Sequence, residues 1–125
     1  MDSKVTIMFR GQELPMGTTL RVAYMVQGQH NHTPYLQIFE GLGEMLLEDQ
    51  IGILWASFRC ANTRYVDDMK LTRNDFQNDI LDNYNLGSMM ELLKQVIDGI
   101  MGNDENTDND TKDVEAVEGN SNSLE

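Results

Sequence analysis

Ser88-Met-Met-Glu-Leu-Leu-Lys-Gln-Val-Ile-Asp-Gly-Ile-Met101 is the stretch that decides the fold of this chain. Its apolar residues recur at intervals of three and four, the spacing of a single helix face. The apolar positions are Met89, Leu92, Leu93, Val96, Ile97 and Ile100, and the polar positions opposite them are Glu91, Gln95 and Asp98. The pattern predicts a final amphipathic helix, with Ser88 and Glu91 as a capping box at its start.

The composition changes at Gly102, directly after this helix. From there the chain has one base, Lys112, and eight acids, which give this segment −7 of the net charge of −12. The acids are Asp104, Glu105, Asp108, Asp110, Asp113, Glu115, Glu118 and Glu125. Without aromatic residues such a segment buries too little apolar surface to offset the entropy of ordering it. We expect a folded domain over residues 1–101 and a disordered acidic tail over 102–125.

Upstream, Val5, Ile7 and Phe9 alternate with Thr6 and Met8, and this period of two residues predicts a strand. A turn at Arg10–Gln12 would pair it with a second short strand ending near Met16. A helix should follow from Gly17-Thr18 and end at Gly28 as its C-terminal cap. Its expected inner face is Leu20, Ala23, Tyr24 and Gln27.

The middle of the chain predicts three more helices. The first starts at Thr33-Pro34 and continues to about Leu47, although Gly41 and Gly43 weaken it. The second is capped by Asp49 and has the inner face Ile51, Leu54, Trp55, Phe58 and Ala61. An irregular stretch over Asn62–Lys70 precedes the third, which has a Thr72–Asp75 capping box and the face Phe76, Ile80, Leu81 and Tyr84. The expected fold class is α+β but mostly α: a short N-terminal β-hairpin, then a bundle of about five helices.

Charge and composition exclude several classes of protein. The 9 Lys and Arg are scattered singly among 21 acids, unlike the basic stripe of a nucleic-acid-binding protein. No apolar run approaches the roughly 20 residues of a membrane-spanning helix, and no secretion signal follows Met1. A single cysteine, Cys60, rules out an intrachain disulfide. We therefore expect a cytoplasmic protein that binds neither nucleic acid nor membranes.

No set of residues predicts catalysis or a cofactor. His30 and His32 share a polar loop without the further ligands that zinc requires. Cys60 lies late in a predicted helix, where a core thiol is the simpler interpretation. Asp104, Asn106, Asp108 and Glu115 match positions of a calcium loop, but no exit helix follows them. We expect no enzyme activity, no cofactor and no structural metal.

Methionine is abundant on the predicted helices, and its flexible side chain suits adaptable binding grooves as well as cores. The final helix has more apolar surface than a small bundle needs. We therefore predict a partner-binding site on this helix, or in the groove between it and the helix that begins near Thr19. The predicted residues are Leu20, Tyr24, Met89, Met90, Leu93, Ile97, Ile100 and Met101.

The order and lengths of these elements resemble the tail assembly chaperones of long-tailed phages, especially phages of Gram-positive bacteria. The resemblance covers Lys4 to Met101, whereas the histidine loop and Asn62–Lys70 match no family pattern. Its main points are the strand and turn Lys4-Val-Thr-Ile-Met-Phe-Arg-Gly11, the helix start Thr19-Leu20-Arg21, the acidic hinge Leu46-Leu47-Glu48-Asp49 before Trp55-Ala56, and Leu71-Thr-Arg-Asn-Asp-Phe76.

The resemblance implies a non-virion protein that acts in the host cytoplasm during viral tail assembly. Such a chaperone binds the tape measure protein, self-associates, and helps to recruit the major tail protein, often through a longer frameshifted form. A net charge of −12 would help to keep an apolar client soluble. The alternative is a small acidic regulatory or inhibitory adaptor that acts on a basic partner through its tail.

Overall fold

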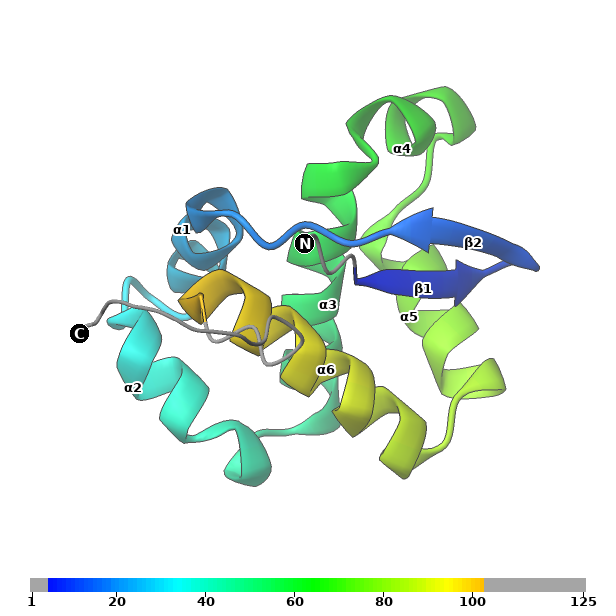
Figure 1. Ribbon diagram of the computed structural model, residues 1–125. Helices are drawn as coiled ribbons and strands as arrows, with labels where there is room; N and C mark the ends of the chain where they lie inside the picture. Colours follow the sequence, from blue (N-terminus) through cyan, green and yellow to red (C-terminus); the bar gives the residue numbers. More distant parts are fainter. Residues whose placement is uncertain (1–4, 103–125) are drawn as a thin grey trace, which may run out of the picture.

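The computed structural model describes residues 5–102 of the 125-residue chain, and it contains an antiparallel hairpin followed by helices (Figure 1). The expected fold class is confirmed. In order, the elements are β1 (Thr6–Phe9), β2 (Gln12–Pro15), α1 (Leu20–Gln29), α2 (Tyr35–Glu40), the 3-10 helix η1 (Leu42–Glu44), α3 (Leu47–Ala61), α4 (Thr63–Met69), α5 (Arg73–Asn83) and α6 (Leu86–Met101). The predicted tail lies outside the described residues.

The hairpin forms at a two-residue turn. Arg10 and Gly11 both have positive φ, 53° and 79°, as the mirror-image turns that join twisted strands require. Alternation along β1 directs Ile7 and Phe9 into the core and leaves Met8 exposed. The Tyr84 hydroxyl accepts a hydrogen bond from Met8 N (3.3 Å) and lies 3.2 Å from Met8 O, so α5 supports the outer edge of β1.

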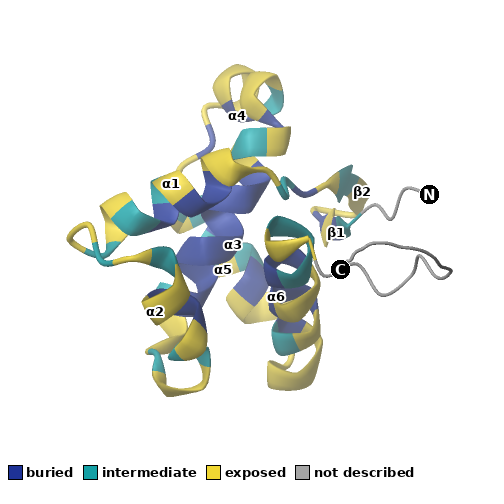
Figure 2. Ribbon diagram, turned by 60° about the vertical axis from the view of Figure 1, so that its left-hand side comes forward, coloured by how far each residue is buried: buried dark blue, intermediate teal, exposed yellow. Residues whose placement is uncertain are grey.

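Helix α3 is the centre of the domain. Every residue from Gln50 to Phe58 is buried, and Figure 2 shows this dark-blue helix surrounded by the others. The sequence predicts a single buried face for this helix, whereas the structure buries every side of this segment. Such burial is typical of a helix that is apolar all round. Ala61, expected on the inner face, is exposed because it lies in the last turn, beyond the packed segment.

Four aromatic rings fill the space between α3, β1 and α5. The Phe58 ring centroid is 5.1 Å from that of Phe9 and 5.0 Å from that of Phe76. Trp55 lies 5.5 Å from Phe76 and stacks on Phe58 at 6.2 Å. Aromatic pairs at such separations contribute beyond the area they bury, and they join the hairpin to the helices.

The predicted inner face of α1 is confirmed at Ala23 but wrong at Leu20 and Tyr24. Leu20 and Tyr24 are 75% and 69% exposed, whereas Val22, Ala23 and Val26 are buried. Both sets have spacings of three and four, so periodicity alone does not separate them. Packing against α3 selects the valine face. Helix α1 also continues past Gly28, the predicted C-terminal cap, and ends at Gln29. A Cβ added at Gly28 would meet nothing within 4 Å.

The long helix predicted over residues 34–47 is interrupted at Gly41. Helix α2 stops at Glu40, η1 follows, and Leu46 is extended before α3 begins. The two glycines weaken helical continuity enough for the chain to turn here. Thr33 does not cap α2, because its hydroxyl donates to His30 O (2.6 Å), and Leu46 rather than Asp49 precedes the first turn of α3.

The stretch Asn62–Lys70, predicted to be irregular, contains α4. The Asn62 amide donates to Pro15 O (2.8 Å) and Phe58 O (3.0 Å), which ties the junction between α3 and α4 to the hairpin. Lys70 has a left-handed backbone (φ 52°) and ends α4. Only Val66 of this helix is buried, so tertiary contacts and not an apolar stripe define it.

The last two helices begin at capping boxes. The box of Thr72 and Asp75 is confirmed, with hydrogen bonds of 3.0 and 3.1 Å. The box predicted for Ser88 and Glu91 is wrong: Asn85 is the N-cap and Ser88 is its partner. Helix α6 therefore begins at Leu86, because its N-cap lies three residues before the predicted one. It ends at Met101, and Gly102 is its C-cap, with a left-handed φ of 79°.

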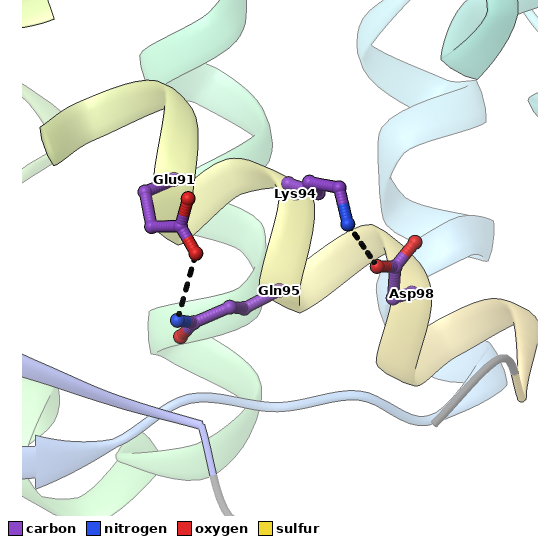
Figure 3. A network of polar contacts seen from close by, with 4 residues as sticks. All are labelled: Glu91, Lys94, Gln95 and Asp98. Carbon is purple, nitrogen blue, oxygen red and sulfur yellow. Dashed lines mark hydrogen bonds and ion pairs between the residues drawn. The ribbon is translucent and has the colours of Figure 1, made fainter. Parts of the chain in front are cut away.

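The predicted amphipathic pattern of α6 is confirmed. Met89, Leu92, Leu93, Val96 and Ile97 are buried, and Ile100 is half-buried. Figure 3 shows the outer face, where Lys94 Nζ lies 3.0 Å from Asp98 Oδ2 and Gln95 Nε2 lies 3.5 Å from Glu91 Oε2. Polar pairs four residues apart support the solvent side of the helix.

Candidate partner-binding site

An apolar hollow of about 120 Å³ opens where α3 begins, α5 ends and α6 begins. We refer to it as the apolar hollow. It is lined by Leu47, Ile51, Ile80, Leu81, Tyr84, Asn85, Leu86 and Met89. A cavity of roughly 150 Å³ with aliphatic walls holds a benzene molecule. The apolar hollow therefore has room for about one leucine-sized or phenyl-sized side chain.

Exposed leucines surround the apolar hollow. Leu47, Leu81 and Leu86 are 44%, 47% and 67% exposed, although all three contribute to its wall. Leu46, the neighbour of Leu47, is 70% exposed. Single exposed apolar residues are ordinary, but several around one concavity are typical of an interaction site.

The side-chain oxygens of Asn85 and Tyr84 in the wall already have hydrogen-bond partners. The Asn85 side chain accepts from Ser88 N at 2.8 Å, and the Tyr84 hydroxyl is bonded to the backbone of Met8. Burial raises the pKa of the Tyr84 phenol, so the hydroxyl stays protonated. A ligand in the apolar hollow would therefore meet mainly carbon atoms, which favours an apolar side chain over a polar or charged group.

Acidic residues adjoin the leucines. Glu48 and Asp49 follow Leu47 in the first turn of α3, and Asp82 follows Leu81 on α5. No carboxylate belongs to the wall itself. The wall of the apolar hollow therefore carries no charge of its own, and it suits a partner with apolar anchors.

The structure divides the residues predicted to bind a partner. Met89, Leu93 and Ile97 are buried, with 2%, 0% and 8% exposure, because the α6 face on which they lie packs into the domain. Leu93 and Ile97 are therefore core residues, which corrects the prediction. Met89 is also in the core, but it reaches the wall of the apolar hollow.

The remaining predicted residues lie away from the apolar hollow. Leu20, Tyr24 and Met101 are exposed, and Met90 and Ile100 are half-buried against the core. The groove predicted between α1 and α6 is closed near Gly99, where an added Cβ would lie 2.6 Å from Thr18 Cγ2. The structure does not bring the eight predicted residues together into one surface.

The sequence prediction missed the exposed leucines of the apolar hollow. Leu81 fits the inner face of a helix and is predicted to be a core residue, while Leu86 falls in a segment predicted to interrupt the helix. Leu86 and Leu47 are the first residues of their helices, and Leu81 lies in the last turn of α5. An apolar residue at a helix end, where burial is incomplete, is the one local signal that could have indicated them.

The histidines and Cys60, which lie within the described residues, are not gathered into a metal site. Within residues 5–102, no three His, Cys, Asp or Glu side chains gather as metal ligands would. His32 is exposed in a loop at positive φ (63°), and Cys60 Sγ lies 3.3 Å from Met25 Sδ. Burial raises the pKa of the Cys60 thiol, and Arg21 and Arg59 lower it in part. The calcium-loop residues Asp104–Glu115 lie outside the described residues.

Comparison with protein families, with characterised proteins and with solved structures finds no match for this chain. In the described part of the chain, no helix has the length and apolar character needed to cross a membrane. The candidate site therefore rests on its own geometry.

Proposed function

We propose that this chain is a phage tail assembly chaperone that binds an apolar helix of the tape measure protein in the host cytoplasm. The observation that carries the proposal is the apolar hollow with its exposed leucines. The resemblance in the order of elements from Lys4 to Met101 supports the choice of client. The chaperone also associates with itself, helps to recruit the major tail protein, and is absent from the mature virion.

The dimensions of the apolar hollow suit a helical client. A helix that docks in a groove inserts anchors spaced by three or four residues, and one of these would fill about 120 Å³. Full burial of a leucine or phenylalanine side chain contributes about 1.5–3 kcal/mol. The exposed Leu47, Leu81 and Leu86 would cover the neighbouring turns of the client.

Co-expression tests this function. The tape measure protein should stay soluble and co-purify with the chain, and Leu81→Gln should weaken the complex about tenfold or more, as expected for an interface anchor. Leu36→Gln is the matched control, because Leu36 is also 47% exposed and helical but lies on α2, outside the apolar hollow. Affinity can be measured by calorimetry with a peptide of the client helix.

Two outcomes would contradict this function. An insoluble and unbound tape measure protein would exclude the chaperone role. Equal losses of affinity in Leu81→Gln and Leu36→Gln would exclude the apolar hollow as the binding site. Because both leucines are partly exposed, neither change is expected to unfold the domain.

The acidic-adaptor alternative is favoured by the charge of the tail, which carries −7 of the net −12. Binding by such an adaptor should collapse at high salt and on removal of Gly102–Glu125. Client binding in the apolar hollow should survive both treatments, because its wall is apolar. Truncation after Met101 therefore distinguishes the two functions.

A further inference from the structure

A second concavity, of about 300 Å³, lies at the other end of α3 and has a different chemistry. We refer to it as the arginine pocket. It is lined by Thr19, Arg21, Met25, Arg59, Cys60 and Thr63, which come from α1, α3 and α4. The two guanidinium groups and the Thr19 hydroxyl are hydrogen-bond donors, whereas the Thr63 hydroxyl donates to Arg59 O (3.0 Å). No acid belongs to the wall.

The two arginines are positioned but their charge is not paired. Arg21 Cζ lies 5.8 Å from the ring centroid of Tyr24, and Arg59 Cζ lies 5.9 Å from that of Trp55. Neither guanidinium forms an ion pair with a carboxylate of residues 5–102. Both act on the Cys60 thiol, whose pKa is raised by burial and lowered by the two charges. Their fields therefore converge on one pocket in a strongly acidic protein.

The described chain ends close to this pocket. Gly99 packs so tightly on Thr18 that an added Cβ would lie 2.6 Å from Thr18 Cγ2 and 2.9 Å from its Cβ. Thr18 directly precedes Thr19 in the pocket wall, and Gly102, which caps α6, follows Gly99 by less than one turn. The eight acids of the C-terminal segment begin with Asp104 and Glu105, immediately beyond that cap.

We propose that the arginine pocket is a carboxylate-binding site whose ligand is the acidic C-terminal segment of the same chain. Residues 103–125 span up to about 75 Å when extended, so their acids reach Arg21 and Arg59 without strain. Guanidinium groups bind carboxylates in a bidentate manner, and the hydroxyl of Thr19 supplies a further donor. This inference does not depend on the identity of the client.

Tethering makes the contact effective. Exposed ion pairs are individually weak, so a separate acidic peptide would bind poorly. A short linker raises the effective concentration of the ligand to about the millimolar range, which populates such a contact within one molecule. Salt at about 0.5 M screens charges beyond roughly 4 Å and should release the segment.

Cys60 is the one cysteine of the chain and lies in the pocket wall, so it reports directly on occupancy. The experiment measures the rate at which the neutral reagent N-ethylmaleimide modifies this thiol in the full chain. The comparison is with a full chain in which the eight acids after Gly102 are changed to amides, from Asp104→Asn to Glu125→Gln. Modification of the native chain should be about threefold slower or more at low salt, and equal at about 0.5 M salt.

The double variant Arg21→Gln/Arg59→Gln is the decisive control. Loss of the two arginines changes the reactivity of the Cys60 thiol with either tail. The relevant quantity is therefore the ratio of the modification rate with the amide tail to that with the native tail, both measured in the double variant. This ratio should fall to about one. Arg10→Gln/Lys70→Gln removes the same charge outside the pocket and should keep the threefold ratio. Equal rates in the native and amide chains at low salt would overturn the proposal. A ratio that grows with protein concentration would also overturn it, because the segment would then bind a second copy.

Discussion

The two ends of α3 differ in what they offer to a ligand. Its first turns, with Leu47 and Ile51, contribute to the apolar hollow, whereas its last turn brings Arg59 and Cys60 to the arginine pocket. The segment between them, up to Phe58, is buried. One helix therefore supports an apolar surface at one end and a cationic surface at the other.

The difference shows how a small acidic domain can keep two ligands apart. An apolar anchor gains little at the arginine pocket, where it would desolvate guanidinium groups, and a carboxylate gains nothing in the apolar hollow. Salt should weaken only contacts at the cationic end. The two proposed contacts should therefore be chemically independent, although both surfaces are built on α3.

The largest expected effect comes from removing the centre that both ends share. Phe58→Ala should lower the free energy of unfolding by about 3–5 kcal/mol, since the ring is fully buried between Phe9 and Phe76. Urea unfolding followed by circular dichroism measures the change. Tyr24→Ala, at a 69% exposed ring, should change stability by less than about 0.5 kcal/mol. A comparable loss in both variants would show that Phe58 is not central to the core.

A smaller loss of stability is expected from a substitution near the cationic end of α3. Gly99→Ala places a Cβ against the stiff, branched side chain of Thr18, and overpacking of this kind costs about 1–3 kcal/mol. The better helix propensity of alanine returns about 1 kcal/mol, so we expect a net loss of about 1 kcal/mol in urea unfolding. Client binding at the apolar hollow should not change, because Gly99 and Thr18 lie outside its wall.

Gly87→Ala is the control on the same helix and should have the opposite sign. The nearest atom to an added Cβ there is Asn85 Oδ1 at 3.5 Å, an ordinary contact. This variant should stabilise the domain by up to about 1 kcal/mol through helix propensity. If both alanine variants stabilised the domain, the close approach of α6 to Thr18 would be wrong.

The smallest effect concerns α5, which supplies Leu81 to the apolar hollow. Hydrogen bonds from the Thr72 backbone and side chain lower the pKa of the Asp75 carboxyl below its ordinary value. The folded-state pKa lies below the unfolded one, so this stabilisation is complete above about pH 4 and is lost as the pH falls through the lowered pKa. Asp75→Asn should therefore be less stable than the native chain near neutral pH, and the difference should shrink as the pH falls toward about pH 2.

The capping box of α6 provides the comparison for this pH effect. Asn85 and Ser88 do not titrate, so the loss caused by Ser88→Ala should be the same at both pH values. Urea unfolding at the two pH values measures both variants. A loss for Asp75→Asn that persists undiminished at about pH 2 would show that its carboxylate charge is not the stabilising element.

Local signals in the sequence were sufficient where one segment contains all the information. The Thr72–Asp75 box, the apolar stripe of α6 and the hairpin turn, predicted at Arg10–Gln12 and observed at Arg10-Gly11, depend on residues within a few positions of one another. Capping, turn geometry and helical periodicity are short-range effects, and the structure confirms each of them.

Local signals failed where a choice depended on a distant partner. The two candidate faces of α1 have the same periodicity, and only contact with α3 selects Val22 and Val26 over Leu20 and Tyr24. Helix α4 has a single buried residue, so no apolar periodicity in the sequence predicted it. For the same reason the sequence assigned Leu93 and Ile97 to a partner, although the domain buries them itself.

By itself, the sequence determined the α+β class, the hairpin, the amphipathic last helix and the concentration of acid after Gly102. Each of these follows from composition or from spacing along one segment, because side-chain direction repeats with the local backbone. Only the tertiary structure decided where α3 lies and which surfaces remain at its two ends. The apolar hollow joins three helices and the arginine pocket another three, and surfaces assembled from distant segments depend on packing that no single segment encodes.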